Sequence, residues 1–285
     1  MPALTDIGYI RDLLSRHGFA FSKKLGQNFL INPSVCPRMA DAAVCGRERV
    51  GVLEIGPGIG VLTRELAARA EAVVAVELDD RLPPVLAETL ADCANVTVVQ
   101  GDALKVDLAA VMREHGPDLD WVVCANLPYY ITSPIVMHLL ESRLPFGSIT
   151  VMVQKEAADR LCAAPGTREC GAVSLAVQYY AAPEMLFRVS RGSFMPAPNV
   201  DSAVIRLTVR PEPPCAVADE RRLFSLIRAA FAQRRKTLQN SLCGAGLSRQ
   251  QVADALAAAD VAPTARAEQL TLAQFAAIAR AVESV

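Results

Sequence analysis

The sequence predicts an α/β protein in which a parallel sheet carries helices on both faces, followed by a small domain made of helices alone. From about Val50, runs rich in β-branched residues alternate with runs rich in Ala and Leu, a pattern typical of parallel strands joined by helices. After Pro211, Pro213 and Pro214 only helical patterns remain, which places a boundary there. With 285 residues, 52% of them hydrophobic, the chain is long enough to bury a full core. We therefore expect one domain over residues 1–210 and a second over 211–285.

The elements of the first domain are read from their apolar patterns. Residues 5–16 place four apolar side chains on one face of a helix that ends before Gly18, and the polar segment 22–30 follows as an arm. Strands and helices then alternate. They are, in order, strand 50–55, helix 61–69, strand 72–77, helix 81–91, strands 95–99 and 121–125, helix 133–142 and strand 148–153.

Two further strands are expected before the boundary, at 184–189 and 203–209, on either side of a loop that holds Pro196 and Pro198. Beyond the boundary, the apolar spacing predicts helices over 221–242, 249–259 and 272–282.

Composition indicates a cytoplasmic protein without a metal or a membrane segment. Eight cysteines are scattered without a Cys-x-x-Cys pair, which favours reduced thiols over disulfides or a zinc site. The three histidines share no spacing, so we expect no metal. The first 16 residues lack the apolar core of a signal peptide. Residues 121–140 carry no charge, but their proline, asparagine and hydroxyl side chains favour a buried strand, loop and helix over a membrane span.

A glycine-rich turn follows the first strand of the alternating region. Gly56 and Gly58 allow the backbone to approach a ligand closely at the start of a helix. Their G-x-G-x-G spacing resembles the nucleoside-binding loop of methyltransferases that use S-adenosylmethionine, whereas Val61 stands where a dinucleotide fingerprint has glycine or alanine. Glu77 and Asp102 end the next two strands, where they are placed to accept hydrogen bonds from a ribose diol and an adenine amino group. We therefore expect the Rossmann-like sheet of class I methyltransferases.

The segment Asn126-Leu127-Pro128-Tyr129 ends the strand 121–125 and favours methylation of an amino group on a nucleobase. The lone pair of that nitrogen is delocalised into the ring. Two acceptors, the Asn126 carboxamide oxygen and the carbonyl before Pro128, can draw it out of conjugation by accepting from the amino hydrogens. Proline sets the backbone angle and the Tyr129 ring offers a stacking face. The alternative is a plain strand-to-helix turn with a half-buried tyrosine.

Five segments together resemble one family, the ribosomal RNA adenine dimethyltransferases, and most closely its bacterial small-subunit members. The segments cover much of the stretch from about residue 22 to 242. They are Lys24-Leu25-Gly26-Gln27-Asn28-Phe29-Leu30, Glu54-Ile55-Gly56-Pro57-Gly58, Asn126-Leu127-Pro128-Tyr129-Tyr130, Phe194-Met195-Pro196-Ala197-Pro198-Asn199-Val200-Asp201-Ser202 and Phe231-Ala232-Gln233-Arg234-Arg235-Lys236-Thr237-Leu238.

The resemblance implies a cofactor, a target and residue roles. The expected cofactor is S-adenosylmethionine, with S-adenosylhomocysteine as the product. The expected substrate is two adjacent adenosines in a hairpin loop near the 3′ end of 16S rRNA, in an immature small subunit, and each adenosine would receive two methyl groups. By the same resemblance, Asn28 and Leu30 would close over the cofactor, which Gly56, Glu77, Asp102 and Asn126 would contact. Tyr129 and Phe194 would flank the target adenine.

Basic residues near the second domain are the candidate RNA contacts. Residues 210–285 carry 10 Lys or Arg and 7 Asp or Glu, although the whole chain has a net charge of −1. No acidic residue occurs over 221–240, which favours phosphate contacts over a merely solvated helix face. The candidates are Arg221, Arg222, Arg228, Arg234, Arg235 and Lys236, with Lys23 and Lys24 of the arm. We expect a monomer.

Two other functions stay open at this point. One is an adenine methyltransferase with another target, either large-subunit rRNA of the antibiotic-resistance type or DNA. The other is a ribosome-assembly factor that binds immature small subunits and for which catalysis is secondary or lost.

Overall fold

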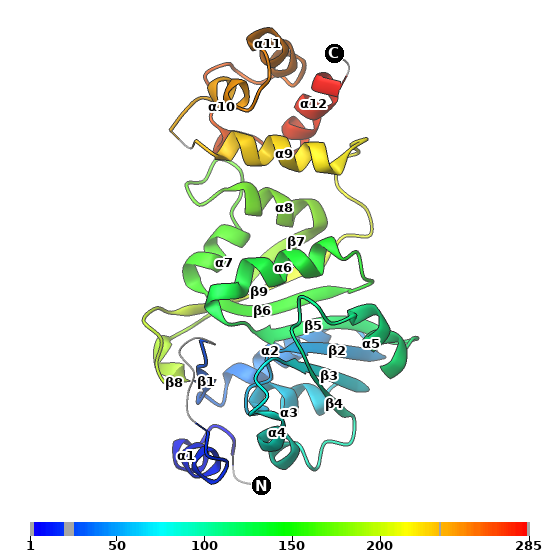
Figure 1. Cartoon of the computed structure of the whole chain (residues 1–285), viewed down its shortest axis with the longest axis vertical. Coiled ribbons are helices and arrows are strands. Elements are labelled where there is room, and N and C mark those ends of the chain that lie inside the picture. Colours follow the sequence, from blue (N-terminus) through cyan, green and yellow to red (C-terminus); the bar gives the residue numbers. More distant parts are fainter. Residues whose placement is uncertain (1–2, 20–25, 234, 284–285) are drawn as a thin grey trace. The chain divides into compact units, whose positions relative to one another are not determined.

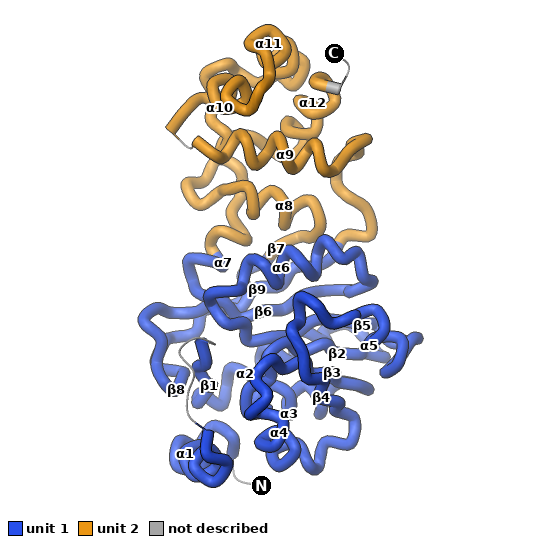
Figure 2. Tube along the Cα trace, viewed as in Figure 1, with its two compact units in different colours: residues 1–158, 184–209 blue, residues 159–183, 210–285 orange. Residues whose placement is uncertain are grey.

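The computed structural model describes residues 3–19, 26–233 and 235–283, which divide into two compact units (Figure 2). The first unit comprises Met1–Ala158 and Glu184–Val209, and the second comprises Asp159–Pro183 and Arg210–Val285. The expected boundary after residue 210 thus lies one residue from the point where the chain passes from the first unit to the second, between Val209 and Arg210. Residues 159–183, expected in the first domain, belong to the second unit, because helix α8 (Ala172–Tyr180) packs through Tyr179 on Phe224.

The main sheet has seven strands in the order β4-β3-β2-β5-β6-β9-β7 (Figure 1). The strands are β2 (Val50–Ile55), β3 (Ala72–Glu77), β4 (Val96–Gln100), β5 (Asp120–Asn126), β6 (Ser148–Gln154), β7 (Ala181–Val189) and β9 (Ser202–Val209). Strands β2 to β6 are parallel, whereas β9 runs antiparallel to β6, so the sheet is mixed and not parallel throughout. The reason is that β9 begins with Ser202 opposite Gln154, the last residue of β6, and must therefore run back along it.

The expected helices of the first unit are present, with small shifts at their ends. They are α1 (Ile7–Arg16), α3 (Val61–Ala67), α4 (Pro83–Thr89) and α6 (Thr132–Glu141). Helices α2 (Val35–Val44), α5 (Leu108–His115), α7 (Lys155–Leu161) and α8 were not predicted. Helices α5 and α7 are short, and α8 is apolar on most sides, so the helical periodicity of their apolar residues is weak. Helix α2 has a clear apolar face that its pattern could have indicated.

The prediction of one long helix over 221–242 was wrong. The chain forms α9 (Glu220–Phe231) and α10 (Leu238–Gly244), separated by a turn. The Thr237 side chain accepts from the Asn240 amide at 3.4 Å and caps α10, which restarts the helix after the break. Arg235 and Lys236 consequently lie in the turn and not on a helix. The unit ends with α11 (Arg249–Ala258) and α12 (Leu272–Glu283).

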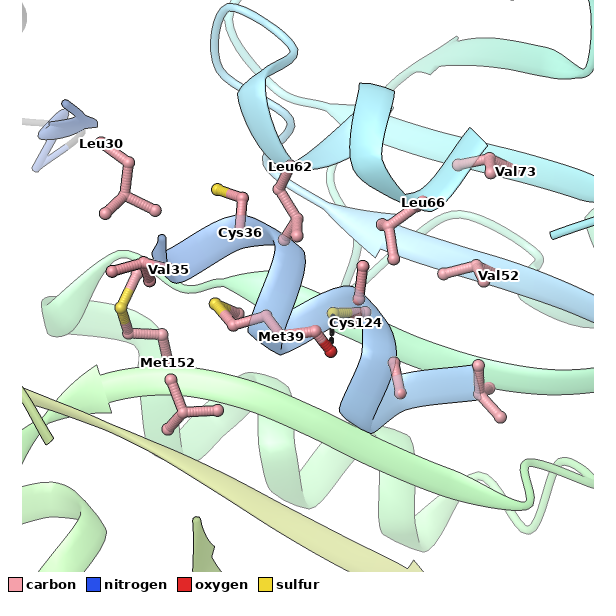
Figure 3. Close-up of a cluster of buried hydrophobic side chains, with 14 of the residues drawn as sticks. Leu30, Val35, Cys36, Met39, Val52, Leu62, Leu66, Val73, Cys124 and Met152 are labelled. Atoms are coloured by element: carbon pink, nitrogen blue, oxygen red, sulfur yellow. Dashed lines mark hydrogen bonds between the residues drawn. The ribbon is translucent and has the colours of Figure 1, made fainter. Parts of the chain in front are cut away.

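Both faces of the central strands are buried, which is why apolar residues run continuously along them. On one face, Met39 of α2 packs among Val52, Leu66 and Cys124, and the Cys124 Sγ lies 3.9 Å from the Met39 carbonyl oxygen (Figure 3). On the other face, Leu53 is equally buried. None of the eight cysteines forms a disulfide, in agreement with the prediction of reduced thiols. Burial raises the pKa of the Cys124 thiol well above its usual range, so this thiol stays neutral.

Replacing Gly51 with alanine should destabilise the first unit by about 1–3 kcal/mol. A Cβ at Gly51 would lie 2.8 Å from the ring of Trp121 on the neighbouring strand, and that ring is held by a hydrogen bond from its Nε1 to the Gly116 carbonyl at 2.8 Å. Urea unfolding followed by the fluorescence of this single tryptophan measures the change. Gly192→Ala is the control, because its added Cβ comes no closer than 3.7 Å to another side chain. Equal midpoints for the two variants would contradict the clash.

Candidate active site

A pocket lies at the carboxyl ends of strands β2 to β5, within the first unit, and encloses about 1100 Å³ including its open mouth. Every residue that the sequence assigned to the cofactor or to catalysis lines this pocket. These residues are Asn28, Leu30, Gly56, Gly58, Glu77, Asp102, Asn126, Leu127, Pro128, Tyr129 and Phe194. They come from segments up to 166 residues apart in the sequence. The parallel order of β2 to β5 brings the residues at their ends together, whereas Asn28, Leu30 and Phe194 come from segments outside those strands.

The glycine-rich turn joins β2 to α3. Gly56 and Gly58 have φ values of 70° and 61°, in the left-handed region that side chains with a Cβ disfavour. A Cβ at Gly58 would also lie 3.2 Å from the ring of Phe29. The turn therefore requires glycine both for its backbone and for the close packing of the arm.

Two carboxylates stand at successive strand ends. Glu77 is buried at the end of β3, and its Oε1 accepts from the Asp79 amide at 2.8 Å. Burial raises the pKa of Glu77, and backbone hydrogen bonds from Asp79 and Gly58 oppose this rise. Asp102 follows β4, accepts from the Leu104 amide at 3.0 Å and lies 3.5 Å from the Lys105 Nζ. Each carboxylate retains acceptor capacity for hydroxyl or amino groups of a ligand.

Two free acceptors stand side by side at the end of β5. The Asn126 carboxamide makes no hydrogen bond to another residue that the structure describes. The Leu127 amide donates to the Met152 carbonyl at 3.1 Å, while its own carbonyl accepts no backbone hydrogen bond within the described chain. Pro128, with φ −58° and ψ 133°, holds the backbone extended at this point. The pocket wall thus offers a carboxamide and a carbonyl to an incoming amino group.

Two aromatic rings complete this part of the pocket. The Tyr129 hydroxyl lies 2.7 Å from the Oγ of Ser202, a buried residue at the start of β9. Burial raises the pKa of Tyr129, so its phenol is neutral. Phe194, in strand β8 (Phe194–Met195), is almost fully buried. The sequence singled out both rings but missed the hydroxyl of Ser202 that anchors one of them.

The arm reaches the pocket as strand β1 (Phe29–Leu30), which pairs antiparallel with β8 so that Leu30 faces Phe194. The Asn28 Nδ2 donates to the Gly26 carbonyl at 3.0 Å, which leaves its carboxamide oxygen as an acceptor. The wall expected to contact the cofactor and the ring expected to hold the base are therefore parts of one small sheet.

Glu54 is a pocket residue to which the sequence assigned no role. It is 1% exposed, and its Oε2 has no hydrogen-bond partner in the described part of the chain. Burial raises the pKa of Glu54 to about 8. The sequence feature that could have drawn attention to Glu54 is its position as a lone acidic residue between Leu53 and Ile55 in an apolar strand. Two exposed apolar side chains, Leu78 and Tyr130, also line the pocket.

The candidate RNA contacts differ in their surroundings. Arg221 and Arg228 are exposed and lie seven residues apart on α9, which places them on the same face. Arg222 instead donates from its Nη2 to the Val282 carbonyl at 2.9 Å and so caps the last turn of α12. Arg235 and Lys236 are exposed in the turn before α10. The remaining candidates, Lys23, Lys24 and Arg234, lie outside the described residues.

Across the described ranges, no helix combines the length and apolarity needed to cross a membrane. In the same ranges, no group of three or more His, Cys, Asp or Glu side chains is arranged to hold a metal ion.

The chain matches known proteins over nearly its full length. A family model described as ribosomal RNA adenine dimethylase matches residues 18–284. Ribosomal RNA small subunit methyltransferase A of Geobacillus thermodenitrificans is 49% identical over 280 residues, covering 96% of this chain and 95% of the relative. The protein of the same name from Streptococcus pneumoniae is 49% identical over 285 residues, covering 98% of each chain.

Two solved structures are similar over both units. The 23S rRNA methyltransferase ErmE has 32% identity and a TM-score of 0.68, covering 90% of this chain and all of that one. A dimethyladenosine transferase from Plasmodium falciparum has 25% identity and a TM-score of 0.73, covering 88% of this chain and 95% of that one.

Proposed function

This chain belongs to the ribosomal RNA adenine dimethylase family, and from that premise we propose that it methylates two adjacent adenosines of 16S rRNA. Membership makes it an S-adenosylmethionine-dependent rRNA adenine dimethyltransferase. The finer proposal is N6,N6-dimethylation of both adenosines in a hairpin loop near the 3′ end of the RNA. The observation that carries it is the pair of free acceptors, the Asn126 carboxamide and the Leu127 carbonyl, in the pocket that also holds Glu77.

The small-subunit target is favoured over the alternatives by the relatives. The proteins that are 49% identical are named for the small subunit, whereas the similar 23S rRNA enzyme is 32% identical. The proposal includes an immature small subunit as the particle, a role in subunit biogenesis, a monomeric enzyme and a cytoplasmic location. It assigns methyl transfer to the first unit, Met1–Ala158 with Glu184–Val209, and rRNA binding to the helical residues 211–285.

The pocket fits the cofactor by the chemistry of its walls. Glu77 would accept from the ribose hydroxyls and Asp102 from the adenine amino group, while the turn at Gly56 and Gly58 brings backbone close to the ligand. Asn28 and Leu30 would cover it from the arm. When bound, S-adenosylmethionine supplies a methyl group on a positively charged sulfur, open to attack by a nitrogen.

The residues at the end of β5 prepare that nitrogen. Asn126 and the Leu127 carbonyl would accept the two amino hydrogens of adenine, which localises the lone pair on N6. Tyr129 and Phe194 would hold the base by its faces after it leaves the RNA stack. In the transfer, a bond between N6 and the methyl carbon would form as the carbon–sulfur bond breaks, and S-adenosylhomocysteine would leave. The methylated nitrogen is then positively charged and acidic, so its proton passes to water without a strong base.

Mass spectrometry of the RNA tests this function. The purified protein is incubated with S-adenosylmethionine and immature small subunits, and the RNA is digested and mapped. We expect N6,N6-dimethyladenosine at two adjacent positions near the 3′ end. Modification of large-subunit RNA or duplex DNA in place of those positions would refute the proposed target.

The exposed arginines of α9 give a separate prediction for RNA binding. Arg221→Glu combined with Arg228→Glu should raise the KM for RNA about tenfold or more and reduce the salt slope of binding by about two, because two phosphate contacts are lost. The kcat at saturating RNA should stay the same. Arg113→Glu, the same charge reversal on the exposed side of α5, is the control. Equal salt slopes for all proteins would show that α9 does not contact phosphates.

A further inference from the structure

A buried carboxylate joins the arm to the end of strand β3. The Asp79 side chain is 3% exposed, although it lies only two residues beyond Glu77. Its Oδ2 accepts from the Gln27 Nε2 at 2.7 Å and from the Arg81 Nη2 at 2.6 Å, and its Oδ1 accepts from the Arg81 Nε at 2.8 Å. A carboxylate taken out of water must be paired, and Arg81 supplies the charge. Gln27 supplies the link to a segment 52 residues away in the sequence.

The same carboxylate stands at the centre of a chain of contacts between the pocket and the arm. The Asp79 amide donates to Glu77, the carboxylate assigned above to the cofactor. On the other side, the Arg81 guanidinium lies 4.7 Å from the ring centre of Phe19, and that ring lies 6.2 Å from Phe29. Residues 26–30 form one wall of the pocket. The Asp79–Gln27 bond therefore fixes this wall to the strand whose end holds the cofactor carboxylate.

We propose that Asp79 is a positioning residue for the cofactor, which acts by holding Gln27 so that Asn28 and Leu30 form the pocket wall before the ligand arrives. The inference rests on the proposed function of the pocket. Without this bond, the wall must be ordered during binding. The apparent affinity for the cofactor is then the intrinsic affinity multiplied by the fraction of molecules whose wall is already formed. The chemistry at Asn126 lies elsewhere in the pocket, so the rate at saturating cofactor should be preserved.

The test measures binding of S-adenosylhomocysteine, the unreactive product, by calorimetry on the full chain. Gln27→Ala should raise Kd about tenfold, since hydrogen bonds to charged groups are worth at least that factor. Gln27→Glu, which places a second carboxylate against Asp79, should raise Kd further. Asp79→Ala should weaken binding at least as much as Gln27→Ala, and the double variant Gln27→Ala with Asp79→Ala should bind no worse than Asp79→Ala alone.

Asp80→Asn is the matched control. It removes the same charge one residue along, from an exposed position, and should bind the product like the wild type. Hydrogen exchange of the amides of 26–30 gives a second readout. The product should protect them in the wild type and in Asp80→Asn, but protection should be reduced in Gln27→Ala. KM for S-adenosylmethionine should rise in Gln27→Ala with kcat within about twofold, whereas a general loss of folding would lower both thermal midpoint and kcat.

The outcomes separate the inference from the proposed function. If the wild type does not bind S-adenosylhomocysteine, the function proposed for the pocket fails. If the wild type binds S-adenosylhomocysteine and both Gln27 variants bind it with the same Kd as the wild type, the role of Asp79 is refuted while the proposed function stands.

Discussion

Replacing Asn126 with alanine is expected to slow methyl transfer by about two to three orders of magnitude, the usual cost of losing one preorganised hydrogen-bond partner of the transition state. In the proposed function, the carboxamide and the Leu127 carbonyl are the two acceptors that would draw the N6 lone pair out of the adenine ring. With one of them gone, the nitrogen stays conjugated and attacks poorly. The Leu127 backbone keeps its position, because its amide donates to the Met152 carbonyl and does not depend on the Asn126 side chain.

Single-turnover methylation of immature small subunits measures this effect, with the Kd for S-adenosylhomocysteine measured in parallel. The Kd should rise less than about tenfold, since the proposal has Glu77 and Asp102 hold the nucleoside, and both are unchanged. Asn126→Asp keeps an acceptor at the same place and should retain more activity than the alanine variant. Transfer at the wild-type rate in Asn126→Ala would show that the carboxamide has no part in activating N6.

The alanine variant also tests the alternative of an assembly factor. If the protein serves mainly to dock on immature subunits, the Asn126→Ala variant should bind these subunits as tightly as the wild type does. Failure of the wild type to bind any ribosomal particle would remove that alternative.

Glu54→Gln is expected to make the protein more stable than the wild type at pH 8, by several kcal/mol. The pKa of Glu54 is raised to about 8 by burial, above the ordinary value of 4.5. Between these two pH values, the folded protein keeps a proton that the unfolded chain has released. The free energy of unfolding therefore falls as the pH rises through this window, by at most about 1.4 kcal/mol per pH unit from this residue. Glutamine is neutral at every pH and removes this contribution.

Urea unfolding at pH 5, 6, 7 and 8, followed by Trp121 fluorescence, checks the prediction. The variant and the wild type should differ by no more than about 1 kcal/mol at pH 5, where both carry a neutral side chain, and should diverge as the pH rises. Glu141→Gln, at an exposed position, should follow the wild type throughout. Parallel curves for Glu54→Gln and the wild type would mean that Glu54 is ionised in the folded protein.

That the candidate site residues would lie together could be predicted in large part from the sequence, because several of them stand at the ends of strands with strong local patterns. Glu77 and Asn126 each close an apolar run, and parallel strands bring their carboxyl ends to one edge of the sheet. Knowing the strands was therefore enough to expect these side chains in one pocket. Glu54 could not be assigned in this way, because nothing local to an apolar strand shows whether an acidic side chain inside it finds a partner.

The sequence by itself determined the strands β2 to β6, the glycine-rich turn, the motif that follows β5 and the family, since each depends on residues close together in the chain. Only the tertiary structure decided that β9 runs back along β6 and that residues 159–183 join the second unit. The structure also showed that α9 ends at Phe231 and that the cap provided by Thr237 starts a new helix. It also decided that Ser202 anchors Tyr129, that Arg222 caps α12 and that Asp79 holds Gln27. The bonds of Ser202, Arg222 and Asp79 join residues at least 52 positions apart, so they exist only once packing has brought the segments together.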